Sequence, residues 1–250
     1  MELTVAASTI TTVPGITFRS DMTVELVKHS ASDADVIWAA RVSTKGEQSL
    51  ADIDGDPERS AGLINYLMRD RHGTPFEHST MTFYVNAPIF VFREFMRHRT
   101  FSYNEESGRY RKLEPVFYVP GPDRRLVQSG KPGAYQFTAG SAEQHTVVTE
   151  TVENACRQSY EAYLEMLEAG VAREVARTVL PVGLYSSMYA TCNARALMNF
   201  LSLRVKSEDA TFPSFPQREI EMVAEQMETL WAGLMPLTHA AFERNGRVCP

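Results

Sequence analysis

The sequence predicts an α+β fold, with a mixed or antiparallel central sheet flanked by helices that include one long helix. Strand-like and helix-like segments are mixed along the chain without the regular β-α-β rhythm of a doubly wound sheet. Residues 142–168 read as the long helix, with Ser141 as its N-cap and Gly170 at its end. The chain has 250 residues, 44% of them hydrophobic, and no visible linker, so we expect a single domain over residues 1–250.

The first half of the chain predicts two strands and three helices. The alternation over 23–28 indicates a strand, and Ser32 is a candidate N-cap for a helix over 33–42. Asp56, followed by Pro57, is typical of a helix start, and this helix continues to about residue 70. We expect the other segments to be a peripheral arm at 1–20, a polar loop at 45–55, a turn at 72–75, a half-buried strand at 79–86 and a short buried helix from Pro88 to about 97.

The second half of the sequence predicts more helix than sheet. Residues 103–113 read as irregular, 116–119 as a short strand, and the polar, glycine-containing stretch 123–140 as a surface loop. After the long helix we expect a short helix at 173–180, a β-prone segment at 184–192, and helices at 194–204, 217–235 and 236–243.

Composition excludes several classes of protein. The formal charge is 25 − 31 = −6, and a globally acidic chain is a poor non-specific ligand for nucleic acid. The three cysteines, Cys156, Cys192 and Cys249, form no CxxC pair, zinc spacing or disulfide framework, which fits a reducing cytosol. No signal peptide is visible and no apolar run approaches the roughly 20 residues that span a bilayer. We therefore expect a cytoplasmic protein with no membrane or nucleic-acid partner.

The most informative block is 97–110, which follows the apolar run 87–92. It gathers Arg97, Arg99 and Arg109 around polar side chains, and arginine forks bind phosphate through two parallel hydrogen bonds. His98, between two arginines, should be neutral. The block predicts a site for a phosphorylated ligand. An equally supported alternative is a surface salt-bridge cluster with Glu94, Glu105 and Glu106.

Three other clusters each have a plain structural alternative. The two histidines and the glutamate of 72–78 suggest a metal, but the spacing is not HExxH, so a turn is favoured and no metal is expected. Arg177 either faces a cleft or pairs with Glu174 at i,i+3. The polar residues of 193–204 either line a site or decorate an amphipathic surface helix, and Asn199 needs a partner if it is buried.

The absence of several common sequence motifs excludes some kinds of active site. The sequence has no GxGxxG, no Walker A loop and no GxSxG, so no Rossmann nicotinamide site, P-loop or hydrolase elbow is predicted. Cys192 lies in an apolar, β-prone stretch and is expected in the core rather than as a nucleophile.

Taken in order, these motifs resemble the flavin-dependent thymidylate synthase family over roughly residues 23–245. The most specific element is the RHR triplet at 97–99 followed after seven residues by Ser107. The other matching segments are Thr-Pro-Phe-Glu-His at 74–78, Ala-Pro-Ile-Phe-Val at 87–91, Ser-Gly-Arg-Tyr at 107–110, Arg-Glu-Val-Ala-Arg at 173–177, Val-Leu-Pro at 179–181 and Asn-Ala-Arg-Ala-Leu-Met-Asn-Phe-Leu at 193–201.

The resemblance implies a homotetramer with FAD where subunits meet, and reductive methylation of dUMP to dTMP. Methylenetetrahydrofolate would supply the carbon and NADPH the reducing equivalents. By motif, the residues that would contact FAD are Thr74, Arg97, His98, Arg99, Glu105, Asn193, Ala194, Arg195 and Asn199. Those that would line the dUMP pocket are Glu94, Phe95, Met96, Arg97, Glu105, Glu106, Ser107, Gly108, Arg109, Arg177 and Arg204. His72 would flank the outer face of the flavin, where folate or NADPH approaches.

The implied chemistry agrees with the residues present. Methylating C5 of uracil requires electron density at C5, which a cysteine thiolate or a flavin hydride can provide, and this chain offers no activated cysteine. Arg204 is assigned the catalytic role of meeting negative charge on the pyrimidine, and Ser107 has no evident base and is assigned to binding. One departure is the segment 207–217, where many relatives have a shorter Ser-His-Ala-Gln-type sequence. The alternative function is a non-catalytic FAD- or nucleotide-binding module.

Overall fold

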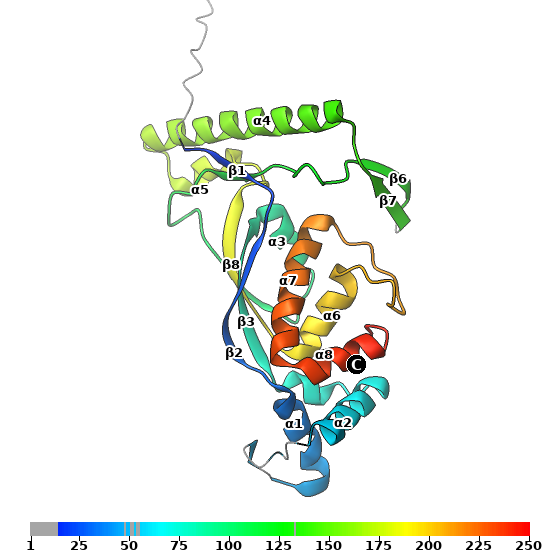
Figure 1. Cartoon of the computed structure of the whole chain (residues 1–250). Helices are drawn as coiled ribbons and strands as arrows, with labels where there is room; N and C mark the ends of the chain where they lie inside the picture. Colours follow the sequence, from blue (N-terminus) through cyan, green and yellow to red (C-terminus); the bar gives the residue numbers. More distant parts are fainter. Residues whose placement is uncertain (1–14, 48, 51–52, 54–55, 133) are drawn as a thin grey trace, which may run out of the picture. The chain divides into compact units, whose positions relative to one another are not determined.

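The computed structural model describes residues 15–47, 49–50, 53, 56–132 and 134–250 (Figure 1). The chain forms two compact units. The smaller unit takes in the residues up to Ser20, 107–126 and 139–185, and the larger unit takes in 21–106, 127–138 and 186–250. Each unit is described by itself below.

The larger unit is built on a four-stranded sheet with the order β2-β3-β8-β4. The strands are β2 (Thr23–Ser30), β3 (Thr80–Pro88), β8 (Tyr185–Cys192) and β4 (Ser102–Glu105). β2 pairs with β3 antiparallel and β4 pairs with β8 antiparallel. A bulge between Leu26 and Lys28 shifts the register of the first pair. The α+β class and the expected mixed or antiparallel sheet are confirmed.

Period-two alternation divides the two faces of this sheet. Met81, Phe83 and Val85 of β3 are completely buried, as a strand with one face toward a core requires. The intervening residues carry a polar network, in which the hydroxyls of Thr82 and Thr191 lie 2.9 Å apart. The apolar face therefore carries the core, and the polar face holds neighbouring strands together through their side chains.

Helices cover one side of this sheet (Figure 1). α3 contacts β3 and α7, α7 contacts β2 and α6, and α2 packs on α8. Their bounds are α1 (Asp33–Lys45), α2 (Pro57–Arg69), α3 (Ile89–Phe95), α6 (Ala194–Arg204), α7 (Arg218–Leu234) and α8 (Pro236–Arg244), with a 3₁₀ turn η2 (Thr74–Glu77). Trp231, Phe92 and Phe200 are among the large side chains that fill the space between sheet and helices.

The helix starts follow the capping residues in the sequence. The Asp56 carboxylate accepts the backbone N–H groups of Glu58 and Arg59 at 3.0 and 3.2 Å, and Pro57 stands at the first helical position. Ser32 and Asp35 form a capping box at α1. These predicted N-caps are confirmed.

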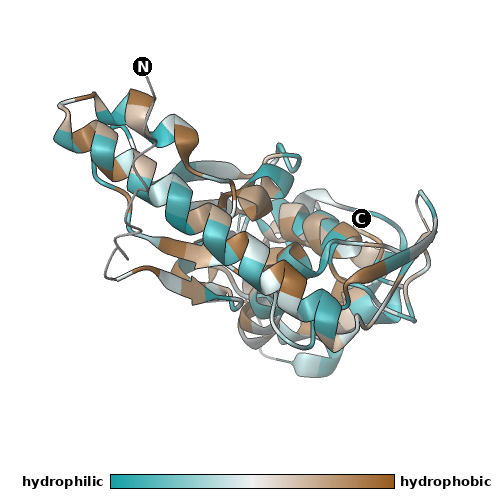
Figure 2. Cartoon of the chain, turned by 90° about the horizontal axis from the view of Figure 1, so that it is seen from above, coloured by the Kyte–Doolittle hydropathy of each residue, from teal (hydrophilic) through white to brown (hydrophobic). Residues whose placement is uncertain are grey.

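The smaller unit is organised by the long helix α4 (Ala142–Glu168), which begins after Ser141 and ends before Gly170 as predicted. Hydrophilic and hydrophobic segments alternate along it (Figure 2). Its Tyr160 hydroxyl donates to the carbonyl of Leu113, and its Tyr163 hydroxyl accepts the Leu113 N–H. α4 thereby fixes the segment that follows residue 107. The unit also contains α5 (Arg173–Ala176) and η3 (Arg177–Val179).

Three expectations about irregular segments need correction. The first residues of the expected irregular stretch 103–113 belong to β4 (Ser102–Glu105), because they pair with β8. The expected loop 123–140 contains a hairpin of β6 (Val127–Lys131) and β7 (Ala134–Thr138). Most of the expected arm 1–20 lies outside the described residues, but Thr17–Arg19 forms β1, which pairs in parallel with β5 (Val116–Tyr118). These strands form because they pair with neighbouring strands, and the local sequence does not reveal those pairings.

No helix in the described ranges is long and apolar enough to cross a membrane. Cys156, Cys192 and Cys249 are free thiols.

Candidate functional site

The Arg97-His98-Arg99 turn directly follows α3 and is fixed by aromatic packing. The hydroxyl of Tyr103 donates to the carbonyls of Phe95 at 2.6 Å and His98 at 2.9 Å. Phe200 of α6 stacks on Phe95 with ring centroids 4.9 Å apart, and the His98 ring meets Phe200 edge-on at 4.8 Å. His98 is consequently buried, while Arg97 and Arg99 are exposed.

Arg204, at the end of α6, is held against this turn by two partners. Its Nη1 lies 2.5 Å from a Glu94 carboxylate oxygen, and its Nε donates to His98 Nε2 at 3.1 Å. Only 19% of the Arg204 side chain and 24% of the Glu94 side chain are exposed. The guanidinium is therefore held in place, and no bond of its Nη2 is recorded among the described residues.

The protonation states around Arg204 follow from burial. Burial, reinforced by the positive charge of Arg204, lowers the pKa of His98 to about 4. His98 is thus neutral at pH 7, and accepting a hydrogen bond at Nε2 places its proton on Nδ1. Neutrality was predicted, but the responsible arginine is Arg204 rather than Arg97 or Arg99. Burial also raises the pKa of Glu94, which Arg204 partly offsets.

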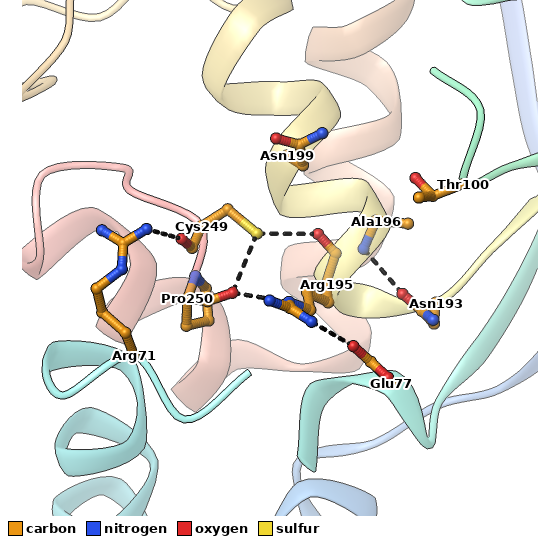
Figure 3. A pocket seen from close by; sticks show the side chains of 9 residues that line it. All are labelled: Arg71, Glu77, Thr100, Asn193, Arg195, Ala196, Asn199, Cys249 and Pro250. Carbon is orange, nitrogen blue, oxygen red and sulfur yellow. Dashed lines mark hydrogen bonds and ion pairs between the residues drawn. The ribbon is translucent and has the colours of Figure 1, made fainter. Parts of the chain in front are cut away.

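Two cavities open beside this turn. One, of about 500 Å³, is lined by Arg97, His98, Arg99, Thr100, Asn199, Leu203 and Arg204. The other, of about 480 Å³, is lined by Arg71, Glu77, Thr100, Asn193, Arg195, Ala196, Asn199, Cys249 and Pro250 (Figure 3). Thr100 and Asn199 line both, so the cavities meet at these residues. Each is large enough for part of a small-molecule ligand.

The second cavity is built at the start of α6. The Asn193 side chain caps this helix by accepting the Ala196 N–H at 2.8 Å. Arg195 points across the opening, where Nη1 lies 2.5 Å from Glu77 and Nε donates to the Pro250 carbonyl at 2.7 Å (Figure 3). Asn199, one turn further on, is exposed rather than buried, so its amide is available to a ligand. The residues of the predicted polar helix face are therefore brought together at one opening.

The predicted nucleotide residues of the smaller unit form a separate group. Arg109 Nε donates to Glu174 at 2.9 Å, with about half of each side chain exposed. Gly108 lies so close to Arg177 that an added Cβ would be 3.1 Å from the Arg177 Cδ. Ser107 accepts the Arg109 N–H through its hydroxyl at 3.3 Å. Ser107, Gly108, Arg109 and Arg177 are thus neighbours within this unit.

The remaining predicted residues lie in the larger unit. Phe95 and Ala194 are buried, Met96 is half exposed, and Glu105 accepts the Ser186 hydroxyl at 3.0 Å. Glu106 follows β4, and its N–H donates to the Ser187 carbonyl. Thr74 begins η2, and exposed His72 stacks on Tyr66. Neither of the last two is among the residues lining the two cavities.

The ion pairs differ from the alternatives that the sequence offered. Glu174 pairs with Arg109 and not with Arg177, and Glu94 pairs with Arg204. Within the described part of the chain, no ion pair of Arg97 or Arg99 is recorded. A salt-bridge cluster of Arg97, Arg99 and Arg109 with Glu94 is therefore not recorded in the described residues, and Glu94 and Arg109 pair instead with partners distant in sequence.

The 72–78 cluster is also dispersed. Glu77 bonds Arg195, and the His78 ring meets Trp38 edge-on at 5.9 Å. In the described residues, the side chains close enough to share a metal ion are instead Glu228, His239 and Glu243, and Arg247 already bonds both of these glutamates.

Sequence reasoning missed six residues that line the second cavity: Arg71, Glu77, Thr100, Ala196, Cys249 and Pro250. Glu77 and Ala196 lie within matching segments, Thr100 lies within the 97–110 block, and Arg71 directly precedes the 72–78 cluster, so proximity to these segments was a usable signal. Cys249 and Pro250 lie about 50 residues beyond Arg195 in the sequence, so no local sequence pattern predicts their contacts with Arg195.

Cys192 is confirmed as a core residue. It is buried in β8, and burial raises the pKa of its thiol. It is consequently a protonated, enclosed thiol and a poor nucleophile.

Comparison with known proteins identifies the family. The family model described as "Thymidylate synthase complementing protein" matches residues 25–237. A protein from Streptomyces avermitilis named flavin-dependent thymidylate synthase is 71% identical over 234 residues, covering 93% of this chain and 95% of that protein. A protein of the same name from Tropheryma whipplei is 58% identical over 233 residues, covering 93% of this chain and 97% of the relative.

Solved structures agree with this result. The crystal structure of the UMP/dUMP methylase PolB from Streptomyces cacaoi bound with 5-Br dUMP matches with a TM-score of 0.89 and 58% identity, covering 94% of this chain and all of that chain. The same methylase bound with 5-Br UMP matches with a TM-score of 0.87 and 56% identity, covering 95% of this chain and all of that chain. The chain therefore belongs to the Thy1 family, the thymidylate synthase complementing proteins.

Proposed function

We propose that this protein is a flavin-dependent thymidylate synthase that methylates dUMP to dTMP. Methylenetetrahydrofolate provides the carbon, NADPH provides the reducing equivalents through FAD, and no cysteine acts as nucleophile. The observation that carries the proposal is the pair of adjoining cavities at Thr100 and Asn199, lined by residues of the RHR and Asn193–Asn199 motifs.

The donor set around these cavities fits FAD. The cofactor has a pyrophosphate, and exposed Arg97 and Arg99, with no ion pair recorded in the described residues, supply unneutralised positive charge at one cavity. Arg195 and Asn199 add guanidinium and amide donors at the other. In our proposal the full FAD set is Thr74, Arg97, His98, Arg99, Glu105, Asn193, Ala194, Arg195 and Asn199, and His72 flanks the approach of folate or NADPH.

Arg204 is proposed to bind the pyrimidine and stabilise the charge that develops on it. Its guanidinium is already fixed by Glu94 and His98, so little reorganisation is needed when negative charge appears. FAD reduced by NADPH would supply a hydride when bound, and the protein's task would be positioning and electrostatics. The proposed dUMP set also contains Glu94, Phe95, Met96, Arg97, Glu105, Glu106, Ser107, Gly108, Arg109 and Arg177.

UMP is a second candidate substrate. The structural neighbour, 58% identical, is described as a UMP/dUMP methylase, so a ribonucleotide is to be tested beside dUMP. The named relatives favour an enzyme over a non-catalytic FAD- or nucleotide-binding module.

Assembly and location complete the proposal. The protein is a single catalytic domain, forms a homotetramer with FAD at subunit interfaces, and works in the cytoplasm. Light scattering on the purified protein tests the tetramer through its mass.

The test of the function is an anaerobic assay with methylenetetrahydrofolate and NADPH, with and without added FAD, on dUMP and on UMP in parallel. We expect FAD-dependent formation of dTMP. Bound flavin without product from either nucleotide would support the binding module instead, and methylation of UMP alone would replace the substrate.

A further inference from the structure

Cys249 and Pro250 line the second cavity, the one at the start of α6. The Cys249 thiol donates to the Arg195 carbonyl at 3.3 Å, and the Pro250 carbonyl accepts from Arg195 Nε at 2.7 Å (Figure 3). Arg71 Nη2 donates to the Cys249 carbonyl at 3.1 Å. Burial raises the pKa of Cys249, so at neutral pH the sulfur carries the proton that it donates. We call residues 247–250 the strap.

A buried arginine anchors the strap at its base. Arg247 is 6% exposed and bonds both carboxylate oxygens of Glu228, at 2.7 and 2.9 Å, and a carboxylate oxygen of Glu243. Burial alone raises the pKa of Glu228, but hydrogen bonds from His239 and Arg247 outweigh it and hold that pKa below its usual range. The anchor therefore stays charged, and breaking it would leave buried ions unpaired.

The strap and Glu77 together fix the Arg195 guanidinium. Nε is occupied by Pro250 and one Nη1 donor by Glu77, while no bond to Nη2 is recorded among the described residues. A Cβ on Gly73 would lie 2.6 Å from Arg195 Nε and 2.8 Å from the Pro250 oxygen. The absence of a side chain at Gly73 is thus what allows Arg195 and the strap to meet.

We propose that the strap is a positioning element for the cofactor, holding Arg195 with its Nη2 donors directed at an anionic group of FAD. This inference rests on the proposed function, because it takes Arg195 as a flavin ligand. Because the Arg195 side chain is already ordered, FAD binding does not have to offset the loss of that side chain's conformational entropy. Losing the strap should therefore weaken FAD binding about threefold to tenfold.

Two variants remove the strap's action in different ways. Replacing the codon of Cys249 by a stop ends the chain at Val248 and keeps the Arg247 anchor. Gly73→Ala inserts a methyl group between Arg195 and Pro250. Gly62→Ala is the matched control, because a Cβ at Gly62 meets nothing within 4 Å. The dissociation constant of FAD is measured by quenching of its fluorescence, and thermal unfolding verifies that each variant is folded.

A double-mutant cycle with Arg195→Ala decides whether the strap acts through Arg195. We expect both strap variants to weaken FAD binding in the wild-type background, and to have no further effect when Arg195 is alanine. Equal weakening in both backgrounds, or tighter binding after removal, would overturn the proposal; tighter binding would make the strap a plug. If Arg195→Ala itself leaves FAD affinity unchanged, the flavin assignment of Arg195 fails, which is a distinct result.

Discussion

Replacing Arg204 with alanine should separate catalysis from folding. The substitution removes the guanidinium that lies 2.5 Å from Glu94 and donates to His98 at 3.1 Å. It leaves the Glu94 carboxylate, 24% exposed, without its cationic partner. An unsatisfied, partly buried charged group costs about 1–3 kcal/mol, so we expect that loss in the free energy of unfolding.

The loss in activity should be larger and of different origin. Removing one preorganised donor from a site of developing negative charge lowers turnover about 10²- to 10³-fold. Arg204→Ala combined with Glu94→Gln removes the stranded charge, so stability should partly recover while dTMP formation does not. Arg204→Lys, which keeps the charge but loses the fork, should fall between.

The assay is anaerobic dTMP formation at saturating dUMP and FAD, beside urea unfolding of the same samples. If Arg204→Ala turns over at the wild-type rate, Arg204 has no catalytic role. If activity recovers in parallel with stability in the double variant, the effect of Arg204 was structural, and the reasoning above is refuted.

Three other predictions concern the pH dependence, the cysteine and the nucleotide site. The folded-state pKa of His98 is about 4, below the 6.5 of the free side chain, so the contribution of His98 to stability is complete above about pH 6.5 and is lost as the pH falls toward 4. The free energy of unfolding should change by up to about 1.4 kcal/mol per pH unit in this range, and chemical unfolding at several pH values measures it. The same slope in a folded His98→Asn variant would contradict the assignment. Cys192→Ala should keep its activity at a stability cost of about 1 kcal/mol, because a buried protonated thiol does no chemistry; loss of turnover in a folded variant would restore a thiolate mechanism. Gly108→Ala places a Cβ 2.8 Å from Leu113 Cδ1 and 3.1 Å from Arg177 Cδ, so we expect a severalfold higher KM for dUMP; steady-state kinetics measure it, and an unchanged KM would remove Arg177 from the nucleotide site.

Segments with strong local signals were predictable from the sequence. The bounds of α4 follow from Ser141 as its cap and those of α6 from its helical pattern, and the structure reproduces both. The same holds for the Asp56–Pro57 start of α2. Hydrogen bonds within a few residues determine these features, so the sequence contains the information locally.

Features created by distant partners were not predictable in this way. β4 forms because β8 lies beside it, and Glu94 pairs with Arg204, 110 residues away, instead of with its neighbours. The strap shows the same limit, since Cys249 and Pro250 have no motif and reach Arg195 only through the fold. The residue types of the site were visible in the sequence, whereas their pairing required the structure.

Asn199 offers the most direct test of the central claim, because it lines both cavities and is exposed on α6. Asn199→Leu places an apolar side chain where the cavities meet, with little expected effect on folding. Fluorescence quenching of FAD and anaerobic dTMP formation are measured on the same preparation. The account predicts that both fall together in a folded protein, whereas wild-type FAD affinity and wild-type dTMP formation would contradict it.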